Sequence, residues 1–499
     1  MGYNATRKAT KRTTYEGGQA YKSAPKLDLY LLAVTSLMSG DSFYEKAGDR
    51  LDRFRSLVAE VLMKGGERFV AGLAIYAREE MNLRTMPTLL VAELFLAGKE
   101  EWGQLASQRV WIRGDEHLEA LAYLDVVGSK RPKSFLRGVA SRLCRMKEYG
   151  FIKYGAARKT YSQKDAIRLS HPKPKAPWQS ALFKYVVHGW DKLDSKEKAL
   201  LPTVAETKSG KAITWEQKIS ADGSTSESWT EAIESMGYMA LLRNLRNFLE
   251  KDVEASQLKG VAAKLADPSR VAKSRQLPFR FLSAMRALPT STPQYLLDAV
   301  SVAADHAVGN VPDLEGDSLV LVDTSGSMEW KTISEKSQVK LVDAAACLGA
   351  ILTHRGGCDL WIFGTASARV KSPSGTPVLA TTGTITNAIG AVGHGTFIGA
   401  AIDASLRKGI QRIFVMTDIQ SHDHATSKKL RGWLDEDASH RLYIVDLAGY
   451  GKPCFDPGHK QITVIGGFSE KIFEFVASME DPDPLGKVEA YAEEVTNEN

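Results

Sequence analysis

The feature that most constrains the fold is a change of hydrophobic period near residue 313. From residue 27 to about residue 308, apolar side chains recur at three- and four-residue steps in one segment after another. This is the period of amphipathic helices. Beyond residue 313, short apolar runs such as Leu319-Val320-Leu321-Val322 alternate with helical segments. Strands that alternate with helices are typical of a doubly wound parallel sheet, so we expect an all-helical part followed by an α/β part.

The helical part has short connections, which predict stacked helix pairs of the HEAT kind. Residues 203–228 are rich in Lys, Ser, Thr and Gly, and we expect them to form an inserted surface loop. In the α/β part we expect strands at 319–322, 360–363, 412–416, 442–445 and 462–465, and helices at 337–354, 384–391, 397–408, 425–434 and 469–478. The predicted domains are a basic N-terminal arm (1–26), the helical repeats (27–312), the α/β domain (313–481) and a disordered acidic tail (482–499).

Length and composition describe an ordinary globular protein. The chain has 499 residues, of which 43% are hydrophobic, enough for more than one core. No apolar run approaches the roughly 18 residues of a membrane span, and the Lys- and Arg-rich start does not resemble a secretory signal. The four cysteines are far apart and form no CxxC, which indicates a reducing compartment and argues against structural zinc. We therefore expect a soluble, cytoplasmic monomer without a membrane partner.

Positive charge is concentrated in one segment. The whole chain has a net charge of +6, but residues 129–184 contain fifteen Lys or Arg and only two acidic residues. Ordinary solvated helix faces mix both signs, whereas one sign at this density favours a polyanion partner. Within the segment, Lys164 and Arg168 share a face of a predicted helix, which Pro172 ends just after His171. Such a row of donors suits phosphate oxygens, although a merely solvated face remains the alternative.

A second group of polar side chains follows the buried strand at 319–322. Asp323, Ser325 and Ser327 stand in a DxSxS loop, where residues that leave the carboxyl end of a strand point into the ligand crevice of an open α/β sheet. Their oxygens are ligands that Mg²⁺ prefers. The loop resembles the metal-ion-dependent adhesion site of von Willebrand A domains. In that pattern Thr396 supplies a further hydroxyl and Asp418 the second carboxylate.

We therefore expect these five residues to bind one divalent cation, with Mg²⁺ favoured and Mn²⁺ or Ca²⁺ as alternatives. A domain that keeps the A-type fold without its metal is the other interpretation. A catalytic role is weaker, because Ser325 lacks the glycine that a nucleophile elbow has two residues earlier. We find no other catalytic motif and expect that the protein is not an enzyme.

The stretch 153–174, with its Leu169-Ser170-His171 core, resembles the characteristic segment of TROVE domains, the helical-repeat rings of the Ro autoantigen family. Further similarities carry the resemblance along nearly the whole chain. They are Tyr15-Glu16-Gly17-Gly18, Arg84-Thr85-Met86-Pro87-Thr88-Leu89-Leu90, Leu277-Pro278-Phe279-Arg280, and Gly467-Phe468-Ser469-Glu470 at the end of the A domain.

The resemblance implies a ring of helical repeats closed by the A domain. Its outer basic surface is expected to bind Y RNA, a small structured non-coding RNA, and its central opening to admit the single-stranded ends of misfolded RNA. Arg158 and His171 match RNA contacts of the family. Lys153 falls one residue away from the expected spacing, with Tyr154 in register instead. A nuclease partner, polynucleotide phosphorylase or another RNase, is also implied.

Two functions follow as hypotheses. The first is an RNA-binding protein that acts in RNA quality control or as an adaptor to RNA decay. The second is a protein-interaction scaffold whose A domain binds an acidic ligand through its metal.

Overall fold

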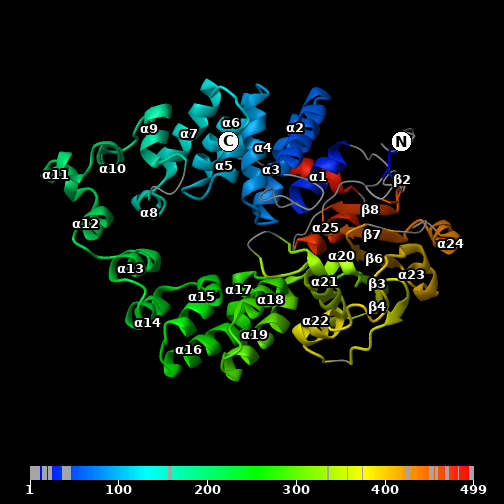
Figure 1. Cartoon of the computed structure of the whole chain (residues 1–499). Helices are drawn as coiled ribbons and strands as arrows, with labels where there is room; N and C mark the ends of the chain where they lie inside the picture. Colours follow the sequence, from blue (N-terminus) through cyan, green and yellow to red (C-terminus); the bar gives the residue numbers. More distant parts are fainter. Residues whose placement is uncertain are drawn as a thin grey trace. The chain divides into compact units, whose positions relative to one another are not determined.

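The computed structural model groups the chain into two compact units, each built from two separate stretches (Figure 1). The sheet unit comprises Met1–Leu51 and Trp229–Glu480, and the repeat unit comprises Asp52–Ser228 and Asp481–Asn499. The structure describes residues 12–13, 19–20, 25–35, 47–155, 160–333, 337–356, 358–373, 375–419, 421, 427–448, 454–455, 459–466, 471–481 and 483–493.

The sheet unit contains a six-stranded mixed sheet. Its strands are β3 (Ser318–Asp323), β4 (Cys358–Phe363), β5 (Ser367–Arg369), β6 (Arg412–Thr417), β7 (Arg441–Asp446) and β8 (Ile462–Gly466). Their order is β5-β4-β3-β6-β7-β8, and all neighbours are parallel except the edge strand β5, which is antiparallel to β4. The order reverses between β3 and β6, as in doubly wound folds, so the expected fold class is confirmed for this part of the chain.

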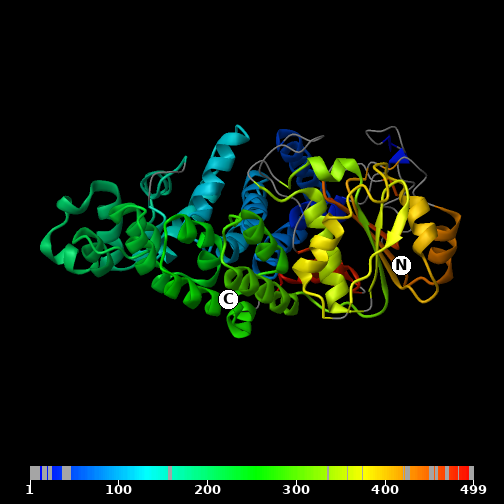
Figure 2. The ribbon, with the colours of Figure 1, turned by 60° about the horizontal axis from the view of Figure 1, so that its bottom comes forward.

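Helices cover both faces of this sheet (Figure 2), and this explains the unbroken apolar run in β3. Leu319 and Leu321 belong to a buried cluster with residues of α23 (Ile398–Ser405) and α24 (Lys428–Glu436). The alternate residues Val320 and Val322 face α21 (Leu341–Arg355) on the other side. Gly349 lets this helix lie close, since a Cβ there would stand 2.9 Å from the side chain of Val322.

The edge of the sheet unit is completed by the start of the chain. Helix α1 (Pro25–Thr35) packs against β8 and α25 (Ile472–Met479). The Tyr30 ring lies 5.2 Å from that of Phe475, and its hydroxyl donates to Ser478 Oγ at 3.3 Å. Two-residue strands β1 (Arg12–Thr13) and β2 (Gln19–Ala20) pair as a short antiparallel ladder.

Several helices that precede the sheet in sequence also pack into the sheet unit. Helices α18 and α19 pack on α21 and α22, and Arg286 forms an ion pair of 2.5 Å with Asp343 of α21. The compact units therefore divide the chain at other places than the predicted domain boundaries, which stay predictions. The remaining helices of the unit are α15 (Tyr238–Glu250), α16 (Ala255–Ala266), α17 (Pro268–Ser274), α18 (Pro278–Ala287), α19 (Gln294–Ala307), η2 (Val308–Asn310), α20 (Gly326–Trp330) and α22 (Val378–Thr386).

The repeat unit is a stack of short helices. From α3 onward, helices pack on the next or the next but one, for example α3 on α5, α5 on α7, and α7 on α9, as expected for helical repeats. Its helices are α3 (Glu67–Glu79), α4 (Thr85–Leu96), α5 (Glu100–Val110), α6 (Glu116–Val126), α7 (Lys133–Arg145), α8 (Glu148–Lys153), α9 (Gln163–Ser170), α10 (Pro177–His188), η1 (Trp190–Lys192), α11 (Ser195–Ala199), α12 (Pro202–Lys208) and α13 (Trp215–Asp222). Two of the boundaries between the units fall within helices, α2 (Ala47–Met63) and α14 (Ser226–Ser235).

Two sequence predictions are wrong. Residues 203–228 are not a surface loop, because α12, α13 and the start of α14 occupy most of this stretch. The acidic tail is not disordered where the structure describes it, since it forms α26 (Pro484–Ala490), which packs on α3. Val488 is fully buried there, and the Tyr491 ring lies 5.3 Å from that of Tyr76. No helix among the described residues has both the length and the apolar character needed to cross a membrane.

Candidate functional site

The predicted metal ligands lie where the order of strands reverses in the sheet. Asp323 is the last residue of β3 and Asp418 directly follows β6, the neighbouring strand. Both carboxylates are completely buried. Parallel strands end at the same edge of the sheet, so the two acids are brought to one place by topology although far apart in sequence.

Hydrogen bonds fix the DxSxS loop around Asp323. Its Oδ1 accepts from the backbone N–H of Ser325 at 2.8 Å, and its Oδ2 accepts from the hydroxyl of Thr417 at 2.6 Å. The hydroxyl oxygens of Ser325 and Ser327 lie 3.3 Å apart. Two hydroxyls and one carboxylate are thereby held on a single turn.

The loop that carries Thr396 meets this turn. The N–H of Gly326 donates to the carbonyl of His394 at 3.3 Å, and the N–H of Gly395 donates to Thr365 Oγ1 at 3.1 Å. Thr396 itself is buried. The structure thus joins the loops that bear the five predicted ligands. Thr417 is a further partner of Asp323, which no sequence pattern marks.

The site holds two buried carboxylates with one ammonium beside them. Burial, and then the charge of Asp418, raises the pKa of Asp323 to about 7. The ammonium of Lys331 lies 3.1 Å from Asp418 Oδ2, whereas Asp418 Oδ1 is buried without a hydrogen-bond partner among the described residues. Unpaired buried carboxylate oxygens are costly. The donors and the unpaired oxygen fit a hard divalent ion.

The described residues contain no group of three or more His, Cys, Asp or Glu that is placed to hold a metal. No sequence pattern marks Lys331, because its partner Asp418 is 87 residues away.

The second candidate site is built on α9 of the repeat unit. Ser162 caps its start in a reciprocal box: Ser162 Oγ accepts from the N–H of Asp165 at 3.2 Å, and Asp165 Oδ2 accepts from the N–H of Ser162 at 2.9 Å. The helix ends at Ser170, and His171 follows in the left-handed conformation with φ of 47°. The expected end of the helix before Pro172 is confirmed, and the backbone of His171, donating to Ile167 O at 2.9 Å, closes it.

Buried amides anchor the first turn of α9 and the connection after it. Gln163 donates to Gly114 O at 2.5 Å, and its Oε1 lies 3.0 Å from His117 Nε2. In the first turn of α10, Gln179 donates to Cys144 O at 2.7 Å and accepts from the N–H of Lys175, in the preceding connection, at 2.6 Å. These bonds fix the helix and the connection on α7 and on the loop before α6. Neither glutamine stands out in the sequence.

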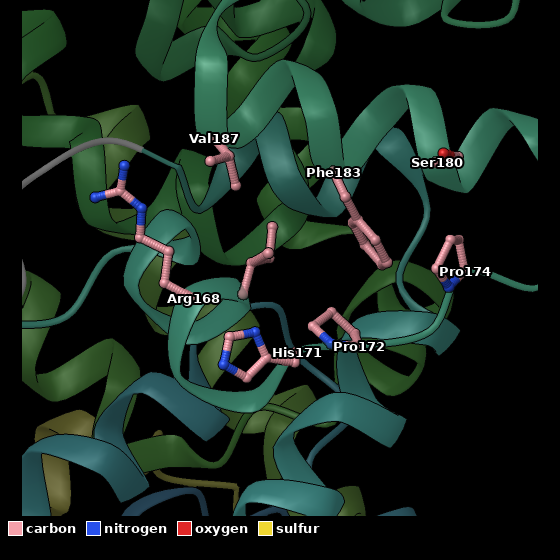
Figure 3. A pocket seen from close by; sticks show the side chains of 8 residues that line it. Arg168, His171, Pro172, Pro174, Ser180, Phe183 and Val187 are labelled. Atoms are coloured by element: carbon pink, nitrogen blue, oxygen red, sulfur yellow. The ribbon is translucent and has the colours of Figure 1, made fainter.

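Two predicted RNA contacts lie together on this scaffold. Arg168 and His171 are exposed and line a cavity of about 390 Å³ between α9 and α10 (Figure 3). Lys164 stands one turn before Arg168 on α9 and is half-buried. The other lining residues are Ile167, Pro172, Pro174, Ser180, Phe183 and Val187.

The remaining predicted contacts are not gathered at this cavity. Lys153 ends α8, where its ammonium lies 3.4 Å from the hydroxyl of Tyr149 and above that ring. The ring of Tyr154 is covered by the guanidinium of Arg113, 5.2 Å from its centre. Arg158 lies outside the described residues.

Few of the cations that the structure describes in the basic segment form an ion pair. Ion pairs within 4.0 Å involve Arg131, Arg137 and Lys184. In the described part of the segment, no such pair involves Lys164 or Arg168. The face of α9 therefore keeps its positive charge available to a ligand.

Part of the chain matches the model of a known domain family. The TROVE domain model matches residues 203–306. The "RNA-binding protein RO60" of Deinococcus radiodurans is 26% identical over 349 residues, which cover 62% of this chain and 65% of that protein. "Telomerase protein component 1" of rat and of mouse is 39% identical over 77 residues and 40% over 73, but the match spans only 3% of either protein.

A solved structure extends the likeness to the fold. The crystal structure of the Deinococcus radiodurans RO (RSR) protein matches with a TM-score of 0.65 and 20% identity, covering 94% of this chain and 99% of that one. The similarity in structure thus reaches well beyond the residues that the TROVE model matches.

Proposed function

Because this chain belongs to the Ro family, we propose that it is an RNA-binding protein that holds structured RNA on the face of α9 bearing Lys164, Arg168 and His171. The observation that carries the proposal is a pair of cations that form no ion pair within 4.0 Å among the described residues, on a helix that buried amides hold in place. Double-helical RNA hides its base edges in a deep, narrow groove, so such a face meets phosphates and 2′-hydroxyls.

The proposal is tested by the salt dependence of hairpin RNA binding, measured by fluorescence anisotropy. Each phosphate contact contributes about 0.7 to 0.9 to the log-log salt slope, so the double variant Lys164→Ala, Arg168→Ala is expected to lower the slope by roughly 1.5. The matched control is Lys408→Ala, Lys428→Ala, which removes two exposed cations of the sheet unit. Equal slopes for the two double variants contradict the proposal.

His171 contributes differently, because its ring borders the cavity while its backbone already closes the helix. The variant His171→Ala is expected to weaken hairpin binding and to leave the melting temperature nearly unchanged. A lower melting temperature with unaltered RNA affinity assigns the ring to capping instead.

The family resemblance gives the finer parts of the proposal. The RNA is a small non-coding RNA of the Y type, and single-stranded ends of misfolded RNA enter the central opening of a helical ring. The protein serves RNA quality control or brings RNA to polynucleotide phosphorylase or another RNase, in the cytoplasm, as a monomer and without being an enzyme itself. Sequencing of copurified RNA tests the identity of the ligand.

We further propose that the sheet unit is a von Willebrand A domain with a metal-ion-dependent adhesion site. Asp323, Ser325, Ser327, Thr396 and Asp418 hold one Mg²⁺, directly or through water, with Mn²⁺ or Ca²⁺ as alternatives. A bound Mg²⁺ offers an open position to an oxygen ligand of a partner. Support comes from the three joined loops and from the unpaired Asp418 Oδ1.

This site also supports a second candidate function, a metal-dependent protein-interaction scaffold. The two functions are separated by comparing what copurifies with the protein. RNA bound whether or not Mg²⁺ is present favours the first, whereas a protein partner lost on chelation, with no RNA, favours the second.

A further inference from the structure

We propose that the rim of the metal site in the sheet unit binds a nucleoside phosphate, with the phosphate at the metal and the base stacked on Trp330. The inference rests on the metal site proposed above and deepens it, because it names the chemical class of the ligand. A free nucleotide and the phosphorylated end of an RNA strand share this chemistry. The residues concerned all belong to the sheet unit.

Trp330 is a large apolar side chain that lies in solvent. It is 84% exposed, the highest value among the exposed large hydrophobic side chains of the described residues. Its backbone is nevertheless fixed on both sides. Met328 is completely buried, and the carbonyl of Lys331 accepts from the N–H of Leu341 at 2.8 Å. An exposed indole on a fixed backbone offers a ligand a flat surface at a low cost in ordering.

Trp330 also stands beside the predicted metal ligands. It is the last residue of α20, and the predicted ligand Ser327 precedes it by three positions. Residues three apart on a helix share one face, with Cβ atoms about 5–6 Å apart. The next residue, Lys331, places its ammonium 3.1 Å from Asp418 Oδ2. One short segment therefore carries a metal ligand, an aromatic surface and a cation.

A histidine borders the same segment from another loop. The carbonyl of His394 accepts from the N–H of Gly326 at 3.3 Å, and its Nδ1 lies 3.7 Å from the position that a Cβ on Gly326 would take. The side chain of His394 is exposed. An imidazole can donate a hydrogen bond to an anion or stack on a base. Two loops thus bring polar and aromatic groups to the rim of the metal site.

Charge favours a phosphate as the ligand of this site. A divalent ion neutralises the carboxylates of Asp323 and Asp418, and the ammonium of Lys331 then remains as excess positive charge. Asp418 Oδ1, buried without a hydrogen-bond partner among the described residues, is an oxygen that the ion can use. A phosphate monoester carries about −1.5 to −2 charges at pH 7 and three acceptor oxygens, which suffice for the ion and the ammonium. Mg²⁺ in proteins is commonly bound by one or two carboxylates together with phosphates of a substrate.

The indole narrows the ligand from a phosphate to a nucleoside phosphate. Inorganic phosphate would leave Trp330 uncovered. Every nucleobase has a flat face that stacks on an aromatic side chain, and in a nucleotide the base is joined to a phosphate through one ribose. A single small ligand thereby covers the indole and supplies oxygens to the ion.

The test is titration calorimetry of the full chain in Mg²⁺ with adenosine 5′-monophosphate, ribose 5-phosphate and adenosine as probes. Stacking of one base typically changes affinity by roughly 5- to 150-fold, so the monophosphate is expected to bind tighter than ribose 5-phosphate by a factor in this range. Adenosine, and the monophosphate in the presence of a chelator, are expected to bind far more weakly because the phosphate–metal contact is missing.

Variants of Trp330 separate stacking from phosphate binding. Trp330→Ala is expected to remove the preference for the monophosphate over ribose 5-phosphate, and Trp330→Phe to keep part of it, because a phenyl ring also stacks. The matched control Met63→Ala removes a side chain that is 81% exposed at the end of α2, and it is expected to keep the whole preference. An unchanged preference in Trp330→Ala overturns the proposal.

Short oligoadenylates with a phosphate or a hydroxyl at the 5′ end separate the two sources of the ligand. A gain in affinity from the phosphate that Trp330→Ala abolishes identifies an RNA end, whereas binding of the mononucleotide alone identifies a free nucleotide. An acetylated aspartate amide that binds as tightly as the monophosphate indicates a protein carboxylate and overturns the proposal. Mg²⁺ uptake without nucleotide binding also overturns it and leaves the metal site standing, whereas no Mg²⁺ uptake overturns the metal site itself.

Discussion

The pKa of Asp323 gives a prediction about stability that needs no knowledge of the ligand. In the absence of a divalent cation, burial and the neighbouring Asp418 raise this pKa from 3.8 to about 7. The folded chain then binds a proton that the unfolded chain has released. Stability from this carboxyl is full below the unfolded pKa and is lost as the pH rises through the folded one.

The magnitude follows from the two pKa values. Each unit of pKa difference corresponds to about 1.4 kcal/mol of stabilisation by the bound proton. Most of this stabilisation is lost between about pH 5 and about pH 8. With a chelator present, the free energy of unfolding of the sheet unit is therefore expected to fall over this interval by about 3 kcal/mol more in the wild type than in Asp323→Asn, which stays neutral.

The assay is calorimetric or denaturant unfolding of the full chain at several pH values. Asp435→Asn, which alters an exposed carboxylate of α24, serves as the control and is expected to follow the wild type. Saturating Mg²⁺ is expected to abolish the extra loss, because the cation favours the ionised carboxylate. Identical pH profiles for the wild type and Asp323→Asn refute the reasoning.

Two further predictions concern other contacts. Lys331→Met removes the ammonium 3.1 Å from Asp418. Because Mg²⁺ then no longer competes with this ammonium for the carboxylate, titration calorimetry is expected to show up to roughly tenfold tighter Mg²⁺ binding. Unchanged affinity contradicts this prediction. Gly72→Ala places a Cβ 2.3 Å from the carbonyl oxygen of Val488. This substitution is expected to speed amide hydrogen exchange in α26. The control Gly260→Ala has open space around it and is not expected to change this exchange. Equal protection of α26 in both glycine variants contradicts the packing argument.

The central strands could be predicted because each carries a physical signature of its own. A buried parallel strand needs an apolar run, and β3, β6 and β7 are such runs. The edge strand β5 has three mainly polar residues, and nothing in so short a segment distinguishes it from a turn. The helix expected at 384–391 is α22, which begins at Val378. The small polar residues of α22 obscure its helical period in the sequence.

Composition misled where tertiary packing decides the structure. The stretch 203–228 is polar enough to resemble a loop, yet α12 and α13 form there, with Thr214 capping α13 and Val204 buried. The tail has a net acidic composition, but Val488 and Ala492 find apolar surroundings. Each of these segments is ordered around one or two buried side chains. So few apolar positions leave no recognisable hydrophobic period in the sequence.

Each candidate site likewise contains residues that could be predicted from the sequence and residues that could not. Residues at strand ends were predictable as a group because topology gathers the carboxyl ends of parallel strands. Their partners were not: Lys331 reaches Asp418, and Gln163 reaches Gly114, across the fold. A single lysine or glutamine gives no pattern in a sequence, and its role depends on the neighbour that folding supplies.

The two units are interleaved along the chain, and this has a consequence for the order in which they mature on the ribosome. Helix α3 emerges early during synthesis, but α26, which packs on it, emerges only after the whole sheet unit. Helix α1 likewise waits for β8 and α25. A nascent chain thus exposes apolar surface on α1 and α3 until β8, α25 and α26 appear, and neither unit is complete in a chain truncated before these elements.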